Sequence, residues 1–249
     1  MNVSFLIALQ IDSNDRLSNL QISTNNLKYH FPDSEIIISE LDNESKIGEE
    51  FSHCKHIFTK TSEFFNKQRA YNIAAKSSSR DVVCLYDADV IIHPKAIQKS
   101  VEMLINKEAE IVWPYDGRFY DVPKKYHSEI NDIKSIKNVL LEDCTLFCST
   151  SVGGAVFFNK NVFLRGGMGN ENFKGAGWED NEIYERFTKL GFKRAKINTF
   201  LLHLTHERKE TSYNYNPHGK HNEQEFSRIY KMSKQQILDE IATWEWNNQ

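Results

Sequence analysis

The sequence predicts an α/β protein built on a mostly parallel sheet with helices on its faces. Short, continuous apolar runs alternate with stretches of helical periodicity between residues 3 and 113, which gives the order βαβαβαβ. Continuous apolar runs are typical of strands that are covered on both faces. The chain has 249 residues, of which 40% are hydrophobic, so it can bury the core of one such domain.

The individual elements follow from local patterns. The predicted strands span residues 3–11, 35–39, 81–86 and 110–113. A first helix is capped by Ser13 or Asp12 and ends before Pro32. Two more helices are expected, one over residues 65–78 and one that begins at Pro94, where a proline fits the first turn.

The second half of the chain has a different character. Glycines are frequent between residues 153 and 177, an acidic helix start follows at 178–180, and a strand is expected over 197–204. Near the C-terminus, Ser233–Gln236 has the pattern of a capping box before an apolar helix. We expect a main domain over residues 1–210 and a helical extension over 211–249 that packs on it. The main domain divides into a half of about 1–115 and a half of about 116–210.

Composition excludes several classes of function. The net charge of about −3 gives no electrostatic reason for nucleic-acid binding. No stretch is long and apolar enough to be expected to span a bilayer, and the N-terminal residues lack the pattern of a signal peptide. The expectation is a cytoplasmic protein, with action at the inner face of the membrane as a further option.

Two carboxylates, Asp87 and Asp89, directly follow the predicted strand 81–86. The carboxyl ends of the strands in a parallel sheet are where ligands bind. Carboxylate oxygens at this place can hold a hard divalent cation. The alternative is a pair of solvated turn residues that also cap a helix.

Two histidines, His203 and His206, follow the apolar run that ends near residue 204. Each alone is more often an ordinary polar histidine, but together with the Asp87–Asp89 pair they supply mixed oxygen and nitrogen ligands. Such a set suits Mn²⁺ better than Mg²⁺. His218 and His221 are weaker candidates for a phosphate or metal contact.

The run Gly177-Trp178-Glu179-Asp180 places an aromatic ring and two acids at the start of a helix. Acids in a first turn complement the helix dipole, which is the simpler interpretation. A carboxylate beside a sugar-stacking tryptophan can instead accept a hydroxyl proton. Lys67 and Arg69, at the start of the helix 65–78, are either phosphate-binding cations or solvated helix residues.

Taken together, these segments resemble a GT-A glycosyltransferase, most closely the β-1,4-galactosyltransferase and chondroitin-polymerase type. Four stretches carry the resemblance in matching order: Ala8–Ser13, Phe65–Asn72, Tyr86–Asp89, and Gly153–Val156 continued by Gly177–Glu182. The family usually has arginine at the position of Gln10, and its acceptor loop often has two further residues after the tryptophan. The resemblance implies a Rossmann-like mixed sheet flanked by helices, with the nucleotide in the first half and the acceptor in the second.

The resemblance also implies roles for individual residues. Asp180 would be the catalytic base, and Glu179 would hold donor or acceptor hydroxyls. Asp89, His206, His203 and Asp87 would form the metal site. The donor nucleotide sugar would contact Gln10, Asp12, Glu40, Asn66, Lys67, Arg69, Asp87, Asp89, Gly154 and Trp178.

The function that follows is metal-dependent, inverting transfer of a hexose or N-acetylhexosamine from a UDP-sugar to a glycan hydroxyl, with Mn²⁺ or Mg²⁺ as the metal. Such a reaction would serve polysaccharide or glycoconjugate synthesis, and the resemblance favours galactose or N-acetylgalactosamine. Two alternatives stay open. A nucleotidyltransferase would normally show a glycine-rich loop after the first strand, where this chain has no glycine. A non-catalytic carbohydrate- or nucleotide-sugar-binding protein of the same fold is the other.

Overall fold

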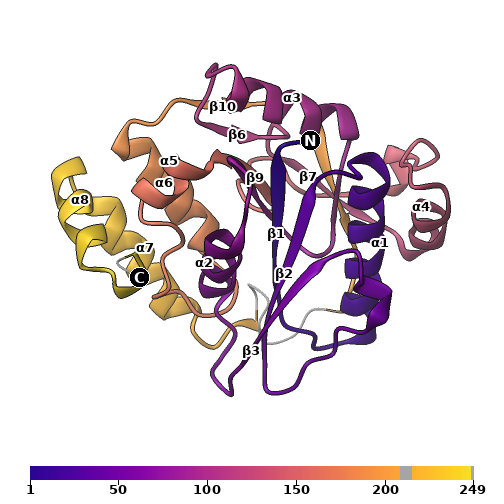
Figure 1. Ribbon diagram of the computed structural model, residues 1–249, viewed down its shortest axis with the longest axis horizontal. Helices are drawn as coiled ribbons and strands as arrows, with labels where there is room; N and C mark the ends of the chain where they lie inside the picture. Colours follow the sequence, from indigo (N-terminus) through magenta and orange to yellow (C-terminus); the bar gives the residue numbers. More distant parts are fainter. Residues whose placement is uncertain (208–214, 248–249) are drawn as a thin grey trace.

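A computed structural model describes residues 1–207 and 215–247 of the chain. Its centre is a sheet that has seven strands in this described part, in the order β10-β6-β9-β4-β1-β2-β3 (Figure 1). The strands are β1 (Val3–Leu9), β2 (Glu35–Asp42), β3 (Lys55–Lys60), β4 (Val82–Tyr86), β6 (Ile111–Trp113), β9 (Ala155–Asn159) and β10 (Arg194–Lys196).

Most neighbours in this sheet are parallel, but β9 runs antiparallel to both β4 and β6. The mixed α/β sheet flanked by helices, predicted from the sequence, is therefore confirmed. The strand β9 was not predicted, because its short apolar run lies among glycines. The strand β3 is also absent from the predicted elements, since its six residues show neither a continuous apolar run nor a regular apolar–polar alternation.

Helices flank the sheet and pack against it. They are α1 (Asn14–His30), α2 (Lys67–Ser77), α3 (Pro94–Ile105), α4 (His127–Ile133), α5 (Lys160–Arg165), α6 (Glu179–Leu190), α7 (Gly219–Lys231) and α8 (Lys234–Thr243). The predicted N-cap Ser13 accepts a hydrogen bond from the Arg16 amide, and α1 ends before Pro32 as expected. The predicted capping box at Ser233 is present as well.

A second, four-stranded sheet in the described residues stands beside the first and completes the site. Its order is β5-β11-β7-β8, with β5 (Val90–Ile92), β7 (Arg118–Val122), β8 (Thr145–Cys148) and β11 (Phe200–Leu204). The strand β5 begins three residues after Asp87, so the chain passes from the large sheet into the small one at the two predicted metal-binding carboxylates. Strand β11 starts later than the expected residue 197.

The C-terminal helices α7 and α8 pack against α6, away from the large sheet (Figure 1). A small core of Leu190, Ile229, Ile237, Ile241 and Trp244 joins the three helices. The expected boundary between residues 210 and 211 lies outside the described residues, so the division of the chain into two parts stays a proposal. Within the described ranges, no helix has both the length and the apolar character that a bilayer crossing needs.

One fully buried ion pair ties these parts together. Arg186 of α6 lies 2.6 Å from the Glu182 carboxylate and donates hydrogen bonds to the carbonyls of Gly166 and Met168. Its guanidinium also stacks 5.0 Å from the Trp244 ring of α8. Burial raises the pKa of Glu182 and Arg186 opposes that rise.

We predict that Arg186→Met lowers the free energy of unfolding by about 3–5 kcal/mol, because it leaves the buried Glu182 carboxylate without its cation. Adding Glu182→Gln to this variant should recover part of the loss. Urea denaturation followed by circular dichroism measures both, with Arg165→Met on the exposed side of α5 as the control. A loss in Arg186→Met no larger than in the control would contradict the account.

Candidate active site

A cleft of about 750 Å³ opens at the carboxyl ends of the central strands. It is lined by residues from distant parts of the chain, among them the end of β1, the starts of α1 and α2, the turn after β4, the loop 150–154, the end of β11 and the start of α6. Its volume falls in the range of small-molecule and cofactor sites. The cleft therefore lies where the strand order predicts a ligand.

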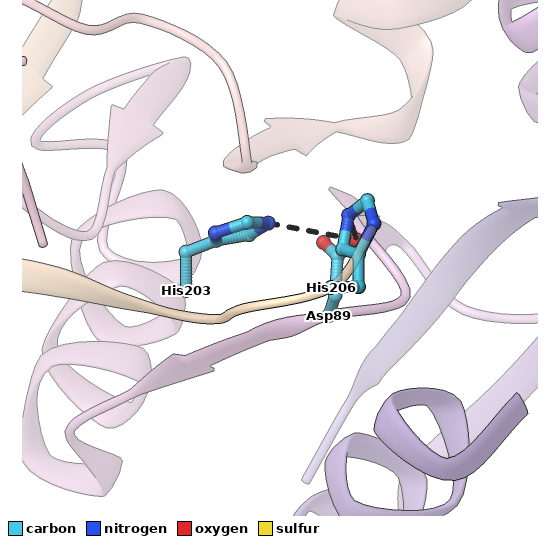
Figure 2. A group of neighbouring side chains, drawn as sticks. All are labelled: Asp89, His203 and His206. Carbon is cyan, nitrogen blue, oxygen red and sulfur yellow. Dashed lines mark ion pairs between the residues drawn. The ribbon is translucent and has the colours of Figure 1, made fainter. Parts of the chain in front are cut away.

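Three side chains in this cleft form a candidate metal centre. The Asp89 Oδ2 atom lies 3.1 Å from His206 Nε2 and 3.7 Å from His203 Nε2. Figure 2 shows both imidazole rings directed at the carboxylate. One ligand atom from each residue lies within 4.8 Å of the others.

The backbone explains why residues so distant in sequence meet here. Strand β5 pairs antiparallel with β11, so Val90 lies opposite His203, and the Leu204 amide donates to the Asp89 carbonyl at 2.8 Å. The buried amide of Asn19 in α1 donates to the Leu204 carbonyl at 2.8 Å. Helix α1 thus fixes the strand end that carries the imidazoles.

Each imidazole has its second nitrogen engaged. His203 Nδ1 lies 2.7 Å from the Asp121 carboxylate, and His206 Nδ1 lies 2.7 Å from the Glu207 carbonyl. Both partner oxygens accept a hydrogen bond, so each Nδ1 is the donor and each Nε2 faces Asp89. An acceptor on the far nitrogen of a histidine ligand holds the ring in the tautomer and orientation that metal binding needs.

The charges of the cluster are strongly coupled. Burial opposes the charged form of His203, but the carboxylates of Asp89 and Asp121 outweigh it and raise the pKa of His203 to about 9. Burial likewise opposes the charged form of Asp89, but the two imidazoles and Arg16 hold the pKa of Asp89 well below its usual value. The carboxylate is thus charged and compensated.

The donor set fits a divalent transition metal. Ligand atoms about 2.1 Å from one ion lie roughly 3–4 Å apart, which is close to the separations seen here. One carboxylate oxygen and two imidazole nitrogens suit Mn²⁺ or a similar ion better than Mg²⁺. The expected fourth ligand, Asp87, has its carboxylate engaged with other partners.

Asp87 belongs to a second cluster, which surrounds the ammonium group of Lys67. The Lys67 Nζ atom lies 3.0 Å from Asp87, 3.4 Å from Asp180 and 3.5 Å from Glu179. The Tyr71 hydroxyl donates to Asp87 at 2.7 Å. The buried ammonium group therefore balances part of the negative charge of three carboxylates, one from the turn after β4 and two from the start of α6.

Burial and mutual repulsion shift the pKa values in this cluster. Burial and Asp180 raise the pKa of Glu179 to about 7, against the opposing effect of Lys67. Burial and Asp87 also raise the pKa of Asp180, again against Lys67. Burial favours the neutral form of Lys67, yet Asp180 and Asp87 raise its pKa well above the ordinary value.

The two neighbouring acids have different surroundings. The Glu179 side chain is 3% exposed and accepts a hydrogen bond from the Gly177 amide, whereas the Asp180 side chain is 30% exposed. A Cβ atom at Gly153 would come within 2.2 Å of the Asp180 carboxylate, so that carboxylate needs a glycine opposite it. Asp180 is the acid that a bound molecule can reach.

Trp178 precedes these acids in a conformation that is unfavourable for its residue type. Its φ of +70° lies in the left-handed region, and it is the N-cap of α6. Backbone strain of this kind costs about 1–3 kcal/mol and occurs often at functional sites. The indole stacks on Phe226 of α7, with 5.0 Å between ring centroids and an angle of 24° between the planes.

The structure brings most of the predicted site residues to this one cleft. Its lining includes Gln10, Lys67, Asp87, Asp89, Gly154, Trp178, Glu179, Asp180, His203 and His206. Their roles stay predictions, but the spatial convergence on which those roles depend is present. The weaker candidate His221 lies outside this lining, and its Nε2 contacts the Asn172 carbonyl.

Arg69 does not belong to this cleft lining. It pairs with the exposed Glu63 and lines a separate shallow depression. Residues two apart on a helix face different sides, so Lys67 and Arg69 cannot both point into the cleft. The expected phosphate contact of Arg69 in this cleft is not supported.

Three other predicted nucleotide contacts also lie outside the lining. The Asn66 side chain caps α2 and donates to the Glu171 carbonyl. Glu40 is fully buried and holds the loop after β2, through Ser45, the Lys46 amide and His56. Asp12 contacts Arg16, with 3.1 Å between them. In this structure, the three side chains hold neighbouring parts of the chain in place and do not line the cleft.

Three residues of the site were missed. Arg16 lines the cleft with its Nη1 atom 3.7 Å from Asp89, Tyr71 donates to Asp87, and Asp121 orients His203. The first two were accessible from sequence, because Arg16 is four residues after Asp12 and Tyr71 four after Lys67 on predicted helices. Nothing local marks Asp121, since strand β7 was not predicted.

Comparisons with known proteins agree with this geometry. The model of the family described as glycosyl transferase family 2 matches residues 17–163. No curated protein matches the chain significantly.

Three solved structures are similar in fold. TarS of S. aureus, in complex with UDP-GlcNAc, has 10% sequence identity and a TM-score of 0.60, over 97% of this chain and 72% of that one. The mannosyltransferase PcManGT of Pyrobaculum calidifontis, in complex with GDP-Man and Mn²⁺, has 13% identity and a TM-score of 0.54, over 83% of this chain and 58% of that one. The catalytic domain of Drosophila beta1,4galactosyltransferase 7, in complex with xylobiose, has 14% identity and a TM-score of 0.49, over 78% of this chain and 63% of that one. The chain thus spans less than two thirds of the length of the last two structures.

We predict that Asp89→Ala and His206→Ala abolish measurable Mn²⁺ binding, because each removes a ligand from a three-residue set. Asp121→Asn should weaken binding about 10–100-fold, since it removes the negative charge of the partner that orients His203 and leaves the three ligands in place. Isothermal titration with Mn²⁺ measures this, with Asp239→Asn on the exposed side of α8 as the control. Wild-type affinity in Asp89→Ala would refute the metal centre.

A second prediction concerns the pH dependence of stability. An unfolded glutamate has its ordinary pKa of 4.5, and the folded-state pKa of Glu179 is about 7. Between these values the folded state binds the proton more strongly, so raising the pH from about 5 to 7 destabilises it by roughly 2–3 kcal/mol. The variant Glu179→Gln should lack this contribution.

Unfolding of the wild type and of Glu179→Gln in urea, at several pH values, gives the comparison. The variant should gain stability relative to the wild type as the pH rises through this window. A constant difference between the two proteins would show that Glu179 titrates normally.

Proposed function

The chain belongs to glycosyl transferase family 2, and we propose that it is an inverting, metal-dependent enzyme that moves a hexose or N-acetylhexosamine from a UDP-sugar to a glycan hydroxyl. Its GT-A fold and its glycosyltransferase class are the premise. Metal dependence, stereochemistry and substrates are the proposal. One observation carries it: the Asp89–His203–His206 cluster and the Trp-flanked Asp180 line the same cleft.

The donor is assigned to the half of the cleft formed by the ends of β1 and β4. Gln10 lines this half, and Arg16 adds a cation beside Asp89. TarS and PcManGT were solved with nucleotide sugars, the latter also with Mn²⁺. A UDP-sugar with Mn²⁺ is the proposed pair here, and galactose and N-acetylgalactosamine are the first sugars to test.

Asp89, His203 and His206 would hold the metal. When bound, a divalent cation at this place neutralises charge on a departing diphosphate, which is worth several kcal/mol in such reactions. Lys67 adds a positive charge at the same end of the cleft. Its ammonium group lies between Asp87 and Asp180 and is fixed there by both.

The proton step is assigned to Asp180. The acceptor hydroxyl oxygen attacks the anomeric carbon, the bond from that carbon to the diphosphate oxygen breaks, and UDP leaves with the electron pair. The hydroxyl proton passes to the Asp180 carboxylate, whose raised pKa suits it as a base. Attack from the side opposite the leaving group inverts the configuration.

Neither alternative gains support from the site. A purely binding protein has no need of an accessible carboxylate in the same cleft as a candidate metal centre. Asp180 and the Asp89–His203–His206 cluster share one cleft here. A nucleotidyltransferase would have a glycine-rich loop after β1, and this chain has no glycine there. The acceptor and the cellular location expected from the sequence stay predictions.

The test is a UDP-release assay with Mn²⁺ and a panel of UDP-hexoses and UDP-N-acetylhexosamines, with and without p-nitrophenyl glycosides as acceptors. We expect wild-type turnover with at least one donor. Asp180→Asn should lower transfer about 10²–10⁴-fold, because it removes the general base.

Asp180→Asn should still bind UDP and Mn²⁺ with wild-type affinity in calorimetry, whereas Asp89→Ala should lose this binding. The control is Asp239→Asn. Near wild-type transfer by Asp180→Asn would refute its role as base. Absence of metal-dependent UDP release with every donor would refute the proposed function.

A further inference from the structure

The segment 169–178, which leads into Asp180, is bound along its length by the C-terminal helix α7. Residues in and just before α2 also hold it: Asn72 accepts from the Gly169 amide and donates to the Gly169 carbonyl, and Asn66 donates to the Glu171 carbonyl. The sequence contains many glycines here, and such a segment in isolation would be among the least ordered of the chain. The position of Asp180 therefore depends on the contacts that hold this segment.

A side-chain amide of α7 brackets the middle of the segment. Asn222 is fully buried, accepts from the Lys174 amide at 3.1 Å and donates to the Lys174 carbonyl at 2.9 Å. Just before the helix, Asn216 donates to the carbonyls of Lys174 and Ala176, at 2.6 and 2.8 Å. These bonds add to the backbone hydrogen bond that the Gly175 amide donates to the Phe65 carbonyl at 2.6 Å.

The same face of α7 holds the two ends of the segment. Glu225 accepts hydrogen bonds from Asn170 at 2.8 Å and Asn172 at 3.3 Å. Phe226 stacks on Trp178, which has a positive φ. Residues 225 and 226 lie three and four positions after residue 222, and both therefore share its side of the helix.

From this arrangement we propose that the face of α7 formed by Asn222, Glu225 and Phe226 positions the acceptor side of the cleft. Phe226 covers one face of the Trp178 indole, and the indole lines the cleft, where it offers a platform for a sugar ring next to Asp180. The three α7 residues act as positioning residues, since they line no part of the cleft themselves. The acceptor role rests on the proposed function, whereas the ordering of residues 169–178 by α7 does not.

Hydrogen–deuterium exchange tests the ordering directly. In Asn222→Ala and Phe226→Ala, amides within 169–178 should exchange about ten-fold faster or more, since each variant removes one anchor of the segment. Amides of β1 should keep their wild-type rates. Asn222→Asp, which can accept from the Lys174 amide but not donate to its carbonyl, should fall between.

The matched control is Gln224→Ala, which removes an amide from the exposed side of the same helix. It should leave exchange within 169–178 unchanged. Wild-type exchange rates in Asn222→Ala and Phe226→Ala, or equal acceleration in Gln224→Ala, would overturn the proposal.

Kinetics separate positioning from general damage. With the best p-nitrophenyl glycoside acceptor of the wild type, Phe226→Ala should raise the acceptor KM about ten-fold. The donor KM and the acceptor-independent hydrolysis of the donor should stay within about two-fold of the wild type. An equal loss of donor hydrolysis would mean that α7 supports the whole fold and not the acceptor side.

The two proposals fail in different ways. If the wild type itself releases no UDP, the proposed function fails and the acceptor role falls with it. The exchange result would still decide whether α7 orders the segment before Asp180.

Discussion

The antiparallel pairing of β5 with β11 is the constraint on which the site depends. It sets Asp89 against two imidazoles from a distant part of the chain, and the hydrogen bond between the Leu204 amide and the Asp89 carbonyl fixes their register. A shift of one residue would turn His203 to the other face of the small sheet. Asn19 of α1 holds the same strand end from the other side. The geometry of the candidate metal centre thus follows from strand register and not from flexible side chains.

Charge compensation is the second constraint, and it divides the cleft into two centres. A buried carboxylate is costly unless a cation or several hydrogen bonds balance it. Asp89 is balanced by the imidazoles and by Arg16, and a metal ion would supply that charge instead. Asp87 and Asp180 share Lys67. The lysine keeps the acid proposed as base near the acid that ends the central strand, so donor and acceptor sides are electrostatically linked.

Sequence patterns predicted elements with long apolar or amphipathic runs, and missed several short strands, whether buried or exposed. Strands β1 and β4 and helices α1, α2 and α3 have continuous or helical apolar patterns, and the structure confirms them. The strands β3 and β9 were missed, one because half of its side chains face water and the other because it follows two glycines. The small sheet, of which only β11 was expected, could not be assembled from local signals.

The same limits apply to the site. The end of a predicted strand pointed to Asp87 and Asp89, because strand ends are where a parallel sheet places ligands, whereas the resemblance to GT-A glycosyltransferases pointed to Asp180. Of Lys67 and Arg69, which point to different sides of α2, only Lys67 lines the cleft, so the donor contact of Arg69 stays a prediction. Asp121 depends on a pairing between β7 and β11 that joins distant segments. Such residues are visible only when the fold is known.

The C-terminal helices help to hold the segment that leads into Asp180. The acid proposed as base follows a tryptophan in the left-handed region, at the end of a glycine-containing segment, and none of these features is rigid by itself. Residues just before α2 hold part of the segment, since the Phe65 carbonyl accepts from the Gly175 amide and Asn66 donates to the Glu171 carbonyl. Helices α7 and α8 add to this support, through side-chain hydrogen bonds to the segment and through the buried Arg186, whose guanidinium contacts Trp244 directly after α8. On the proposed function, part of the precision of the acceptor side therefore comes from residues beyond the part of the chain that the family model matches.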